Sequence, residues 1–281
     1  RLVLTCGDKQ ADGKSLNQLA LLQARCGDRL TLHADGDDAA AALQTFRELA
    51  AANFGDPAND SDGKWLARAT PAHAATIRAA VWRCEPPQHD GNALHADRAA
   101  FTEAVATVAT RLDALQSQTA ARLGAAAGDI FAAHTQLLAE LAEATQASAE
   151  ANLAPVWQRE TTNAAAALAA LPDPYLRARA ADIADLAQQV LAQLADAADA
   201  AAPDDAPFIL VARDLYPSRA ATLPANCLAV VLADGDPRSH AALLCQAAQR
   251  PYYHDAGDAV LALTDGQILE ITRDSGEIRQ P

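Results

Sequence analysis

Hydrophobic and polar positions in the first part of the chain predict a small α/β unit. Short apolar runs at 2–5 (LVLT) and 30–33 (LTLH) are typical of strands. A Gly-Asp turn follows the first run, and stretches with helical spacing extend from Ser15 to Gln23 and from Asp37 to Asn53. Two strands and two helices over residues 1–55 therefore indicate a unit of their own.

The middle of the chain predicts a helix bundle. A polar stretch at 56–64 (DPANDSDGK), rich in turn formers, is interpreted as a linker. From 96 to 200 the sequence is rich in alanine, with apolar residues at helical spacing such as Phe101, Val105 and Val108. Roughly four helices, the number that closes a compact bundle, are separated by breaks near Gly124, Gly128, Pro155 and Pro172–Pro174.

The pattern changes again beyond Pro203, where short apolar runs alternate with turns. One helical segment begins at Ser239, and an earlier run at 76–84 (TIRAAVWRC) predicts a further strand. We therefore expect residues 65–95 and 201–281 to form one α/β domain, with the bundle at 96–200 inserted into it. The C-terminal runs that predict strands are 208–212, 228–232, 259–263 and 267–271.

Composition narrows the classes of partner. The formal net charge is −14, from 36 acidic and 22 basic residues, which argues against nucleic acid and anionic membranes as partners. A partner with a basic patch suits this charge better. No window approaches the ~18–20 uninterrupted apolar residues of a membrane-spanning helix.

Cysteine and histidine usage predicts neither a disulfide framework nor a metal site. The five cysteines form no Cys-x-x-Cys pair, which fits reduced, structural thiols in a cytoplasm. The chain opens on Arg1 and contains no methionine, so we expect it to begin partway through a gene product. No metal-type spacing is found among His33, His73, His89, His95, His134 and His254.

One histidine lies where chemistry is favoured. In 235–244 (GDPRSHAALL), Gly235 follows a strand and Ser239 is a good N-cap for a helix that begins with His240. A helix N-terminus disfavours imidazolium, which predicts a neutral, nucleophilic and reachable ring. A phosphoryl group on that ring would meet backbone N–H donors and the Ser239 hydroxyl. A capping-region histidine without chemistry is the alternative, and the local residues leave both open.

The surrounding segments resemble the phosphohistidine domain of bacterial phosphotransferase-system proteins such as Enzyme I. The resemblance lies in FILVARDLYPS (208–218), LAVVLADGDPRSHAALLCQAAQRP (228–251) and LTDGQILEI (263–271). It aligns His240 with the family's phosphorylated histidine. Within the bundle, DIFAAHTQLLAE (129–140) and DPYLRARAADIADL (173–186) are similar to two further family signatures.

Residues 1–55 resemble the second half of the histidine-containing phosphocarrier protein HPr, with KSLNQLALLQARCGDRLTLHADG (14–36) at the centre. That family's own phosphohistidine would fall before Arg1. The order of segments resembles the multidomain phosphotransferase subunits of dihydroxyacetone kinase (DhaM). The resemblance implies a partial HPr-like α/β sandwich, followed by a swivelling phosphohistidine α/β domain with an inserted four-helix bundle.

Several positions depart from the Enzyme I pattern. Tyr216 replaces a threonine that is expected to hydrogen-bond the active imidazole, so either Tyr216 or Ser218 is expected to take that role. Cys245-Gln246 replaces Ala-Arg, which would weaken the hold on a phosphoryl group or partner. The segment 252–254 (YYH) replaces an apolar segment and is expected to lie outside the pocket.

The resemblance implies a cytoplasmic phosphoryl relay in which His240 accepts a phosphoryl group and passes it on toward dihydroxyacetone phosphorylation. Expected partners are an HPr-type phosphocarrier docking on the acidic bundle, Enzyme I, and the nucleotide-binding subunit of the kinase through an upstream domain. The implied relay needs no cofactor or metal in this region. Two alternatives stay open: an N-terminal fragment of Enzyme I, and a non-catalytic module that docks phosphocarriers.

Overall fold

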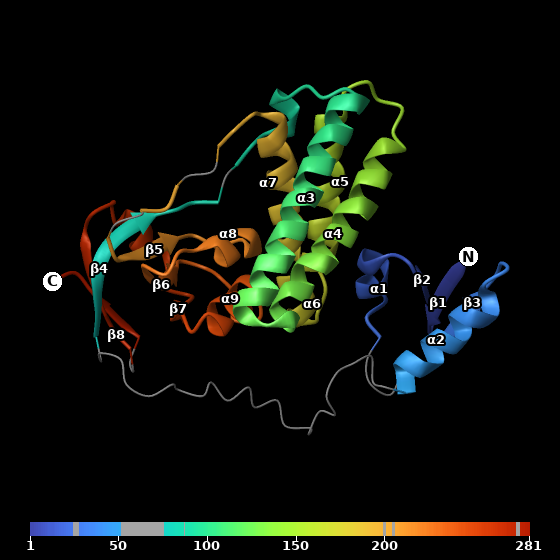
Figure 1. Ribbon diagram of the computed structural model, residues 1–281, viewed down its shortest axis with the longest axis horizontal. Helices are drawn as coiled ribbons and strands as arrows, with labels where there is room; N and C mark the ends of the chain where they lie inside the picture. The colour runs from blue at the N-terminus through green and yellow to red at the C-terminus, as the bar shows by residue number, and fades with distance from the viewer. Residues whose placement is uncertain (25–27, 52–75, 87, 199–200, 204–205, 274–275) are drawn as a thin grey trace. The chain divides into compact units, whose positions relative to one another are not determined.

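The computed structural model divides the chain into two units, Arg1–Ala74 and Ala75–Pro281, which are described separately (Figure 1). The structure describes all residues except 25–27, 52–75, 87, 199–200, 204–205 and 274–275. The linker predicted at 56–64 lies outside the described residues.

Within its described residues, the first unit has a three-stranded antiparallel sheet of order β2-β1-β3 and two helices. Its core contains Leu4, Ala11 and Leu22. The sequence missed β2, since only Ala11 of its four residues is buried and the strand carries no hydrophobic alternation. Instead of a simple turn, the Gly-Asp pair closes a β1–β2 hairpin in which Cys6 pairs with Lys9. The elements are β1 (Leu2–Cys6), β2 (Lys9–Asp12), α1 (Leu16–Leu22), β3 (Leu30–Ala34) and α2 (Ala39–Ala51).

The helical part of the second unit has four long helices, as predicted, and one short helix. Gly128 does not break a helix; it lies buried inside α4, where a Cβ would come within 2.7 Å of the Ala120 Cβ. Pro155 lies in the first turn of α5, where a proline costs no helical hydrogen bond. The helices are α3 (Arg98–Leu123), α4 (Ala125–Gln146), α5 (Leu153–Ala169), α6 (Pro174–Ala178) and α7 (Ala180–Leu194).

The rest of the second unit is built on a six-stranded sheet of order β7-β6-β5-β4-β8-β9. Strands β4 to β7 run parallel, and β8 and β9 are antiparallel to their neighbours. Strand β4 precedes the bundle in sequence and pairs with both β5 and β8. In the sequence, helices α3 to α7 are therefore inserted between β4 and β5, which are adjacent strands of one sheet. The strands are β4 (Thr76–Arg83), β5 (Phe208–Ala212), β6 (Cys227–Leu232), β7 (Tyr252–Tyr253), β8 (Ile268–Thr272) and β9 (Glu277–Arg279).

One predicted strand is wrong. The run 259–263 forms most of a 3-10 helix, η3 (Asp258–Ala262), in which only Val260 is buried. A short apolar run fits a strand or a helical turn equally well, so periodicity alone does not separate them. The sequence also missed the short elements β7, β9, η2 (Gly91–Ala93) and α8 (Pro217–Thr222), which carry too few apolar residues to show a pattern.

The fold brings the helix that begins with His240 against the bundle. This helix, α9 (His240–Ala247), follows β6 and contacts α4, while α8 contacts α3 and α7 (Figure 1). Bundle and sheet therefore meet at the carboxyl ends of the parallel strands. Among the described residues, no helix is long and apolar enough to cross a membrane.

Candidate functional site

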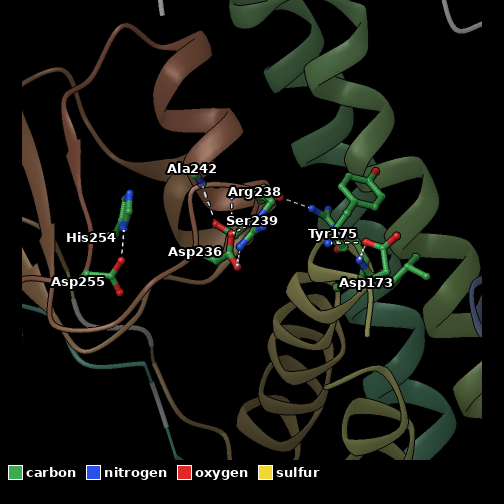
Figure 2. A network of polar contacts seen from close by, with 10 residues as sticks. Asp173, Tyr175, Asp236, Arg238, Ser239, Ala242, His254 and Asp255 are labelled. Atoms are coloured by element: carbon green, nitrogen blue, oxygen red, sulfur yellow. Dashed lines mark hydrogen bonds and ion pairs between the residues drawn. The ribbon is translucent and has the colours of Figure 1, made fainter. Parts of the chain in front are cut away.

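His240 is the first residue of α9, the position that the sequence predicts. The Ser239 Oγ accepts a hydrogen bond from the Ala242 N–H at 3.1 Å, which caps the helix (Figure 2). Gly235, in the turn before it, has φ +83°, and a Cβ there would come within 3.0 Å of the Tyr252 hydroxyl. The turn therefore requires glycine at 235 to place Ser239 and His240 at the helix start.

The imidazole of His240 faces a carboxylate from the bundle. Its Nδ1 lies 2.9 Å from Oδ2 of Asp182, a residue in the first turn of α7. Nδ1 is buried, and the whole side chain is 15% exposed. The ring is therefore less exposed than the sequence predicted, because helices of the bundle cover it. Nδ1 does not belong to the part of the side chain that remains exposed.

Asp182 is the centre of a buried cluster. Its Oδ1 lies 3.5 Å from Nε2 of His134 on α4, and its Oδ2 lies 3.5 Å from Nη1 of Arg179. The side chains of His134 and Asp182 are 2% and 5% exposed. The cluster thus joins α4 and α7 of the bundle to α9 of the sheet part.

A local helix break positions these bundle residues. Asp173 caps α6 by accepting hydrogen bonds from the Tyr175 and Leu176 N–H groups, and Pro174 occupies the first turn. Arg179 ends α6 and precedes α7, and one of its nitrogens donates to the Arg238 carbonyl. The segment resembling the family signature at 173–186 therefore forms a helix–helix corner that points Arg179 and Asp182 at α9.

The pKa values of His240 and Asp182 are both lowered, which favours a neutral ring and an ionised carboxylate. Burial lowers the pKa of His240, as do Arg179 and His134, although Asp182 acts the other way. This direction favours the neutral ring that the sequence predicts, and its largest cause is desolvation by burial. Burial acts to raise the pKa of Asp182, but contacts with His134 and His240 outweigh it and hold the pKa well below its usual range.

The predicted supporting residues lie elsewhere in the junction. Ser218 does not orient His240; its Oγ donates to Asp185 on α7 at 2.6 Å, and its N–H donates to the same carboxylate at 2.8 Å. Tyr216 precedes α8 and lines the cavities beside it, and burial raises its pKa to about 12. At Nδ1 of His240, the place of the expected hydroxyl is taken by Asp182.

Two further departures from the resemblance have structural explanations. Cys245 is fully buried in α9, which raises the pKa of its thiol to about 12 and fits the structural role predicted for the cysteines. Gln246 is exposed, and the cation beside the imidazole is Arg179 instead. Residues 252–254 are not among those that line the described cavities, although the Tyr252 hydroxyl lies beside Gly235 in the turn before α9.

A cavity of about 1160 Å³ opens beside the cluster between α5, α7 and the loops that follow β5 and β6. Ser239 and Gly235 line one side, and Arg177 and Arg213 contribute positive charge. The cavity therefore extends to Ser239 at the start of α9.

Ser218→Ala is expected to destabilise the second unit by about 1–3 kcal/mol, because the buried Asp185 carboxylate loses a short hydrogen bond. Urea unfolding of the full chain, followed by tryptophan fluorescence, measures this loss. The control Thr107→Ala removes an exposed hydroxyl that bonds only within α3 and is expected to stay within about 0.5 kcal/mol. Equal effects of the two substitutions would refute the contribution of this contact.

Three family models match successive segments of the chain. "PTS HPr component phosphorylation site" matches residues 1–52, "PEP-utilising enzyme, N-terminal" matches 61–179, and "PEP-utilising enzyme, mobile domain" matches 204–276. The chain therefore combines a segment of the HPr family with the N-terminal and mobile segments of PEP-utilising enzymes. The last match contains His240, and the first supports the resemblance to HPr.

Individual relatives match nearly the whole length of this chain. The phosphoryl donor subunit DhaM of PEP-dependent dihydroxyacetone kinase from Providencia stuartii is 31% identical over 96% of this chain and 59% of its own length. A multiphosphoryl transfer protein from Xanthomonas campestris is 33% identical over 99% of this chain and 37% of its own length. The chain thus spans 59% or less of these relatives. The resemblance to DhaM predicted from the sequence is confirmed.

A solved structure supports the fold of this phosphotransferase-system chain. The solution structure of Enzyme I (nEIt) matches 72% of this chain and 88% of its own, with a TM-score of 0.54 at 18% identity. The predicted combination of α/β parts with a helical part is therefore confirmed.

Proposed function

We propose that this chain is a phosphoryl relay of the phosphoenolpyruvate-dependent phosphotransferase system, transiently phosphorylated on Nε2 of His240. The observation that carries the proposal is the contact between Nδ1 of His240 and the Asp182 carboxylate. An ionised carboxylate can only accept a hydrogen bond, so the nitrogen beside it carries the proton. The ring proton of His240 therefore lies on Nδ1 and the lone pair on Nε2. The nucleophilic nitrogen is then the one that faces away from Asp182.

The transfer step balances without a cofactor. The Nε2 lone pair attacks the phosphorus of a carrier's phosphohistidine, a new P–N bond forms, and the P–N bond to the carrier breaks. The electron pair of the broken bond returns to the carrier's imidazole, and the proton on Nδ1 of His240 stays beside Asp182. Positioning and charge stabilisation supply most of the catalysis in such transfers. Backbone N–H groups at the start of α9 would donate hydrogen bonds to the phosphoryl oxygens, and the Arg179 guanidinium beside Asp182 would add positive charge near them.

The approach of a carrier is restricted at this junction. The His240 side chain is 15% exposed, and its Nδ1 is buried. In the transfer that we propose, the junction opens around the ring while Nδ1 stays beside Asp182, so that Nε2 keeps its lone pair.

The surface of the bundle supports a carrier with a basic rim. Helix α4 carries Asp129, Glu140 and Glu143 and no basic residue, and it also supplies His134 to the site. Complementary charge of this kind speeds encounter more than it tightens binding. The partner we propose is an HPr-type phosphocarrier that is itself phosphorylated by Enzyme I, in the cytoplasm.

The relatives support two alternative destinations for the phosphoryl group. The DhaM similarity supports transfer toward dihydroxyacetone phosphorylation through the nucleotide-binding subunit of that kinase. The multiphosphoryl transfer protein supports a second route, in which the same segments belong to a longer relay. The two routes differ in whether kinase subunits accept the phosphoryl group.

Incubation of the chain with phosphoenolpyruvate, Enzyme I and HPr tests the proposal. The expected result is one acid-labile phosphate on the chain, located by mass spectrometry at His240. Carrier binding without transfer would establish a docking module instead and overturn the relay. Adding purified dihydroxyacetone kinase subunits with ADP and dihydroxyacetone then distinguishes the first route from the second.

A further inference from the structure

The buried cluster of His134, Asp182 and His240 contains one histidine, His134, that the relay does not use. Among the described residues, Nδ1 of His134 has no hydrogen-bond partner, and Nε2 only approaches Oδ1 of Asp182, at 3.5 Å. His134 is 2% exposed, so water does not compensate its ring. Buried polar atoms without partners are rare in folded proteins and require an explanation.

The geometry of these atoms fits a transition-metal ion. One donor atom from each of the three residues lies within 4.8 Å of the others. The approach of Nε2 of His134 to Oδ1 of Asp182, 3.5 Å, is close to the ~3.3 Å between ligands of a tetrahedral ion with bonds of about 2.0–2.1 Å. A bound ion would draw the third donor, from His240, toward the other two, which gives three protein ligands and leaves a fourth position open.

The chemistry of the donors selects the class of metal. Two imidazoles and one carboxylate suit Zn²⁺ and similar ions, whereas Mg²⁺ and Ca²⁺ require mostly oxygen ligands. The nearby Arg179 guanidinium opposes a cation, but it contacts Oδ2 of Asp182 and leaves Oδ1 to the metal. The burial of both bundle ligands excludes competing water.

We propose that His134, Asp182 and His240 bind a Zn²⁺ ion that inhibits the relay. A metal on Nδ1 of His240 takes the lone pair of that nitrogen and leaves the ring proton on Nε2, which then has no lone pair for phosphorus. The ion also ties α9 to α4 and α7, which prevents the movement that transfer requires. The inhibition rests on the proposed function, whereas the binding does not.

Equilibrium dialysis of the unphosphorylated full chain against ZnCl2 tests the binding. One tightly bound Zn²⁺ is expected, with an affinity at least about tenfold weaker in His134→Gln. The matched control is His254→Gln, which removes a histidine paired with Asp255 on the same unit and is expected to keep the affinity. Equal affinity in wild type and His134→Gln would overturn the site.

A second measurement serves if His134→Gln does not fold. In the wild-type chain, saturating Zn²⁺ is expected to shift the imidazole NMR signals of His134 and His240 and to spare those of His254. Shifts confined to other histidines contradict the proposal. Zn²⁺ is further expected to slow phosphorylation of His240 at least tenfold, with recovery after chelation. An unchanged rate of phosphorylation in the zinc-loaded chain overturns the inhibition. Absence of phosphorylation both with and without Zn²⁺ overturns the proposed function and leaves the result on zinc binding unaffected.

Discussion

His240→Ala is expected to reduce the acid-labile phosphate on the chain to background. The substitution removes the only nitrogen that the account gives to the phosphoryl group, so no slower route remains. The measurement is incorporation of ³²P from phosphoenolpyruvate in the presence of Enzyme I and HPr. His240→Gln provides a second variant of similar polarity in case the smaller side chain leaves the buried Asp182 carboxylate without support.

The matched control for this substitution is His254→Ala. His254 also places its Nδ1 beside a carboxylate, 2.8 Å from Oδ2 of Asp255, but both residues follow β7 and are more exposed (Figure 2). Incorporation in this variant is expected to equal that of the wild type. Loss of phosphate in His254→Ala together with retention in His240→Ala would assign the phosphorylation to His254. That result would contradict the proposed role of His240.

Asp182→Asn is expected to slow phosphorylation of His240 by roughly 10²- to 10⁴-fold, by analogy with enzymes in which an asparagine selects the wrong histidine tautomer. The amide nitrogen of asparagine donates to Nδ1, which transfers the ring proton to Nε2 and removes its lone pair. Rapid-quench measurement of phosphate transfer from phosphorylated HPr gives the rate.

The positioning role of Asp182 has a signature that general destabilisation does not share. In Asp182→Asn, NMR of the imidazole is expected to show the proton of His240 on Nε2, whereas the wild type has it on Nδ1. The matched control Asp255→Asn changes an exposed carboxylate beside His254 and is expected to leave the rate within about threefold. A wild-type rate in a folded Asp182→Asn chain would show that Asp182 does not position the ring.

Local signals made the start of α9 predictable. Ser239 as an N-cap, the turn at Gly235 and the apolar run after His240 are neighbours in sequence, and the structure has the cap bond and the positive φ that they require. The buried strands β5 and β6 and the long helices were predictable for the same reason, since each carries its own hydrophobic pattern.

The contacts of His240 were not predictable from spacing. His134 and Asp182 belong to different helices, and only the packing of α4 and α7 against α9 brings them to the imidazole. The segments 129–140 and 173–186, which resemble family signatures, contain both residues and were the available signal. The same packing explains why the ring is more buried than a helix start alone suggests, and why Ser218 bonds to Asp185 instead.

The most direct test of the account is to determine which ring nitrogen carries phosphorus. The chain, labelled with ¹⁵N in histidine and phosphorylated from phosphoenolpyruvate, is examined by NMR for the coupling between ³¹P and ¹⁵N. The account predicts phosphorus on Nε2 of His240, with Nδ1 still protonated. Phosphorus on Nδ1, or on any other histidine, would contradict it.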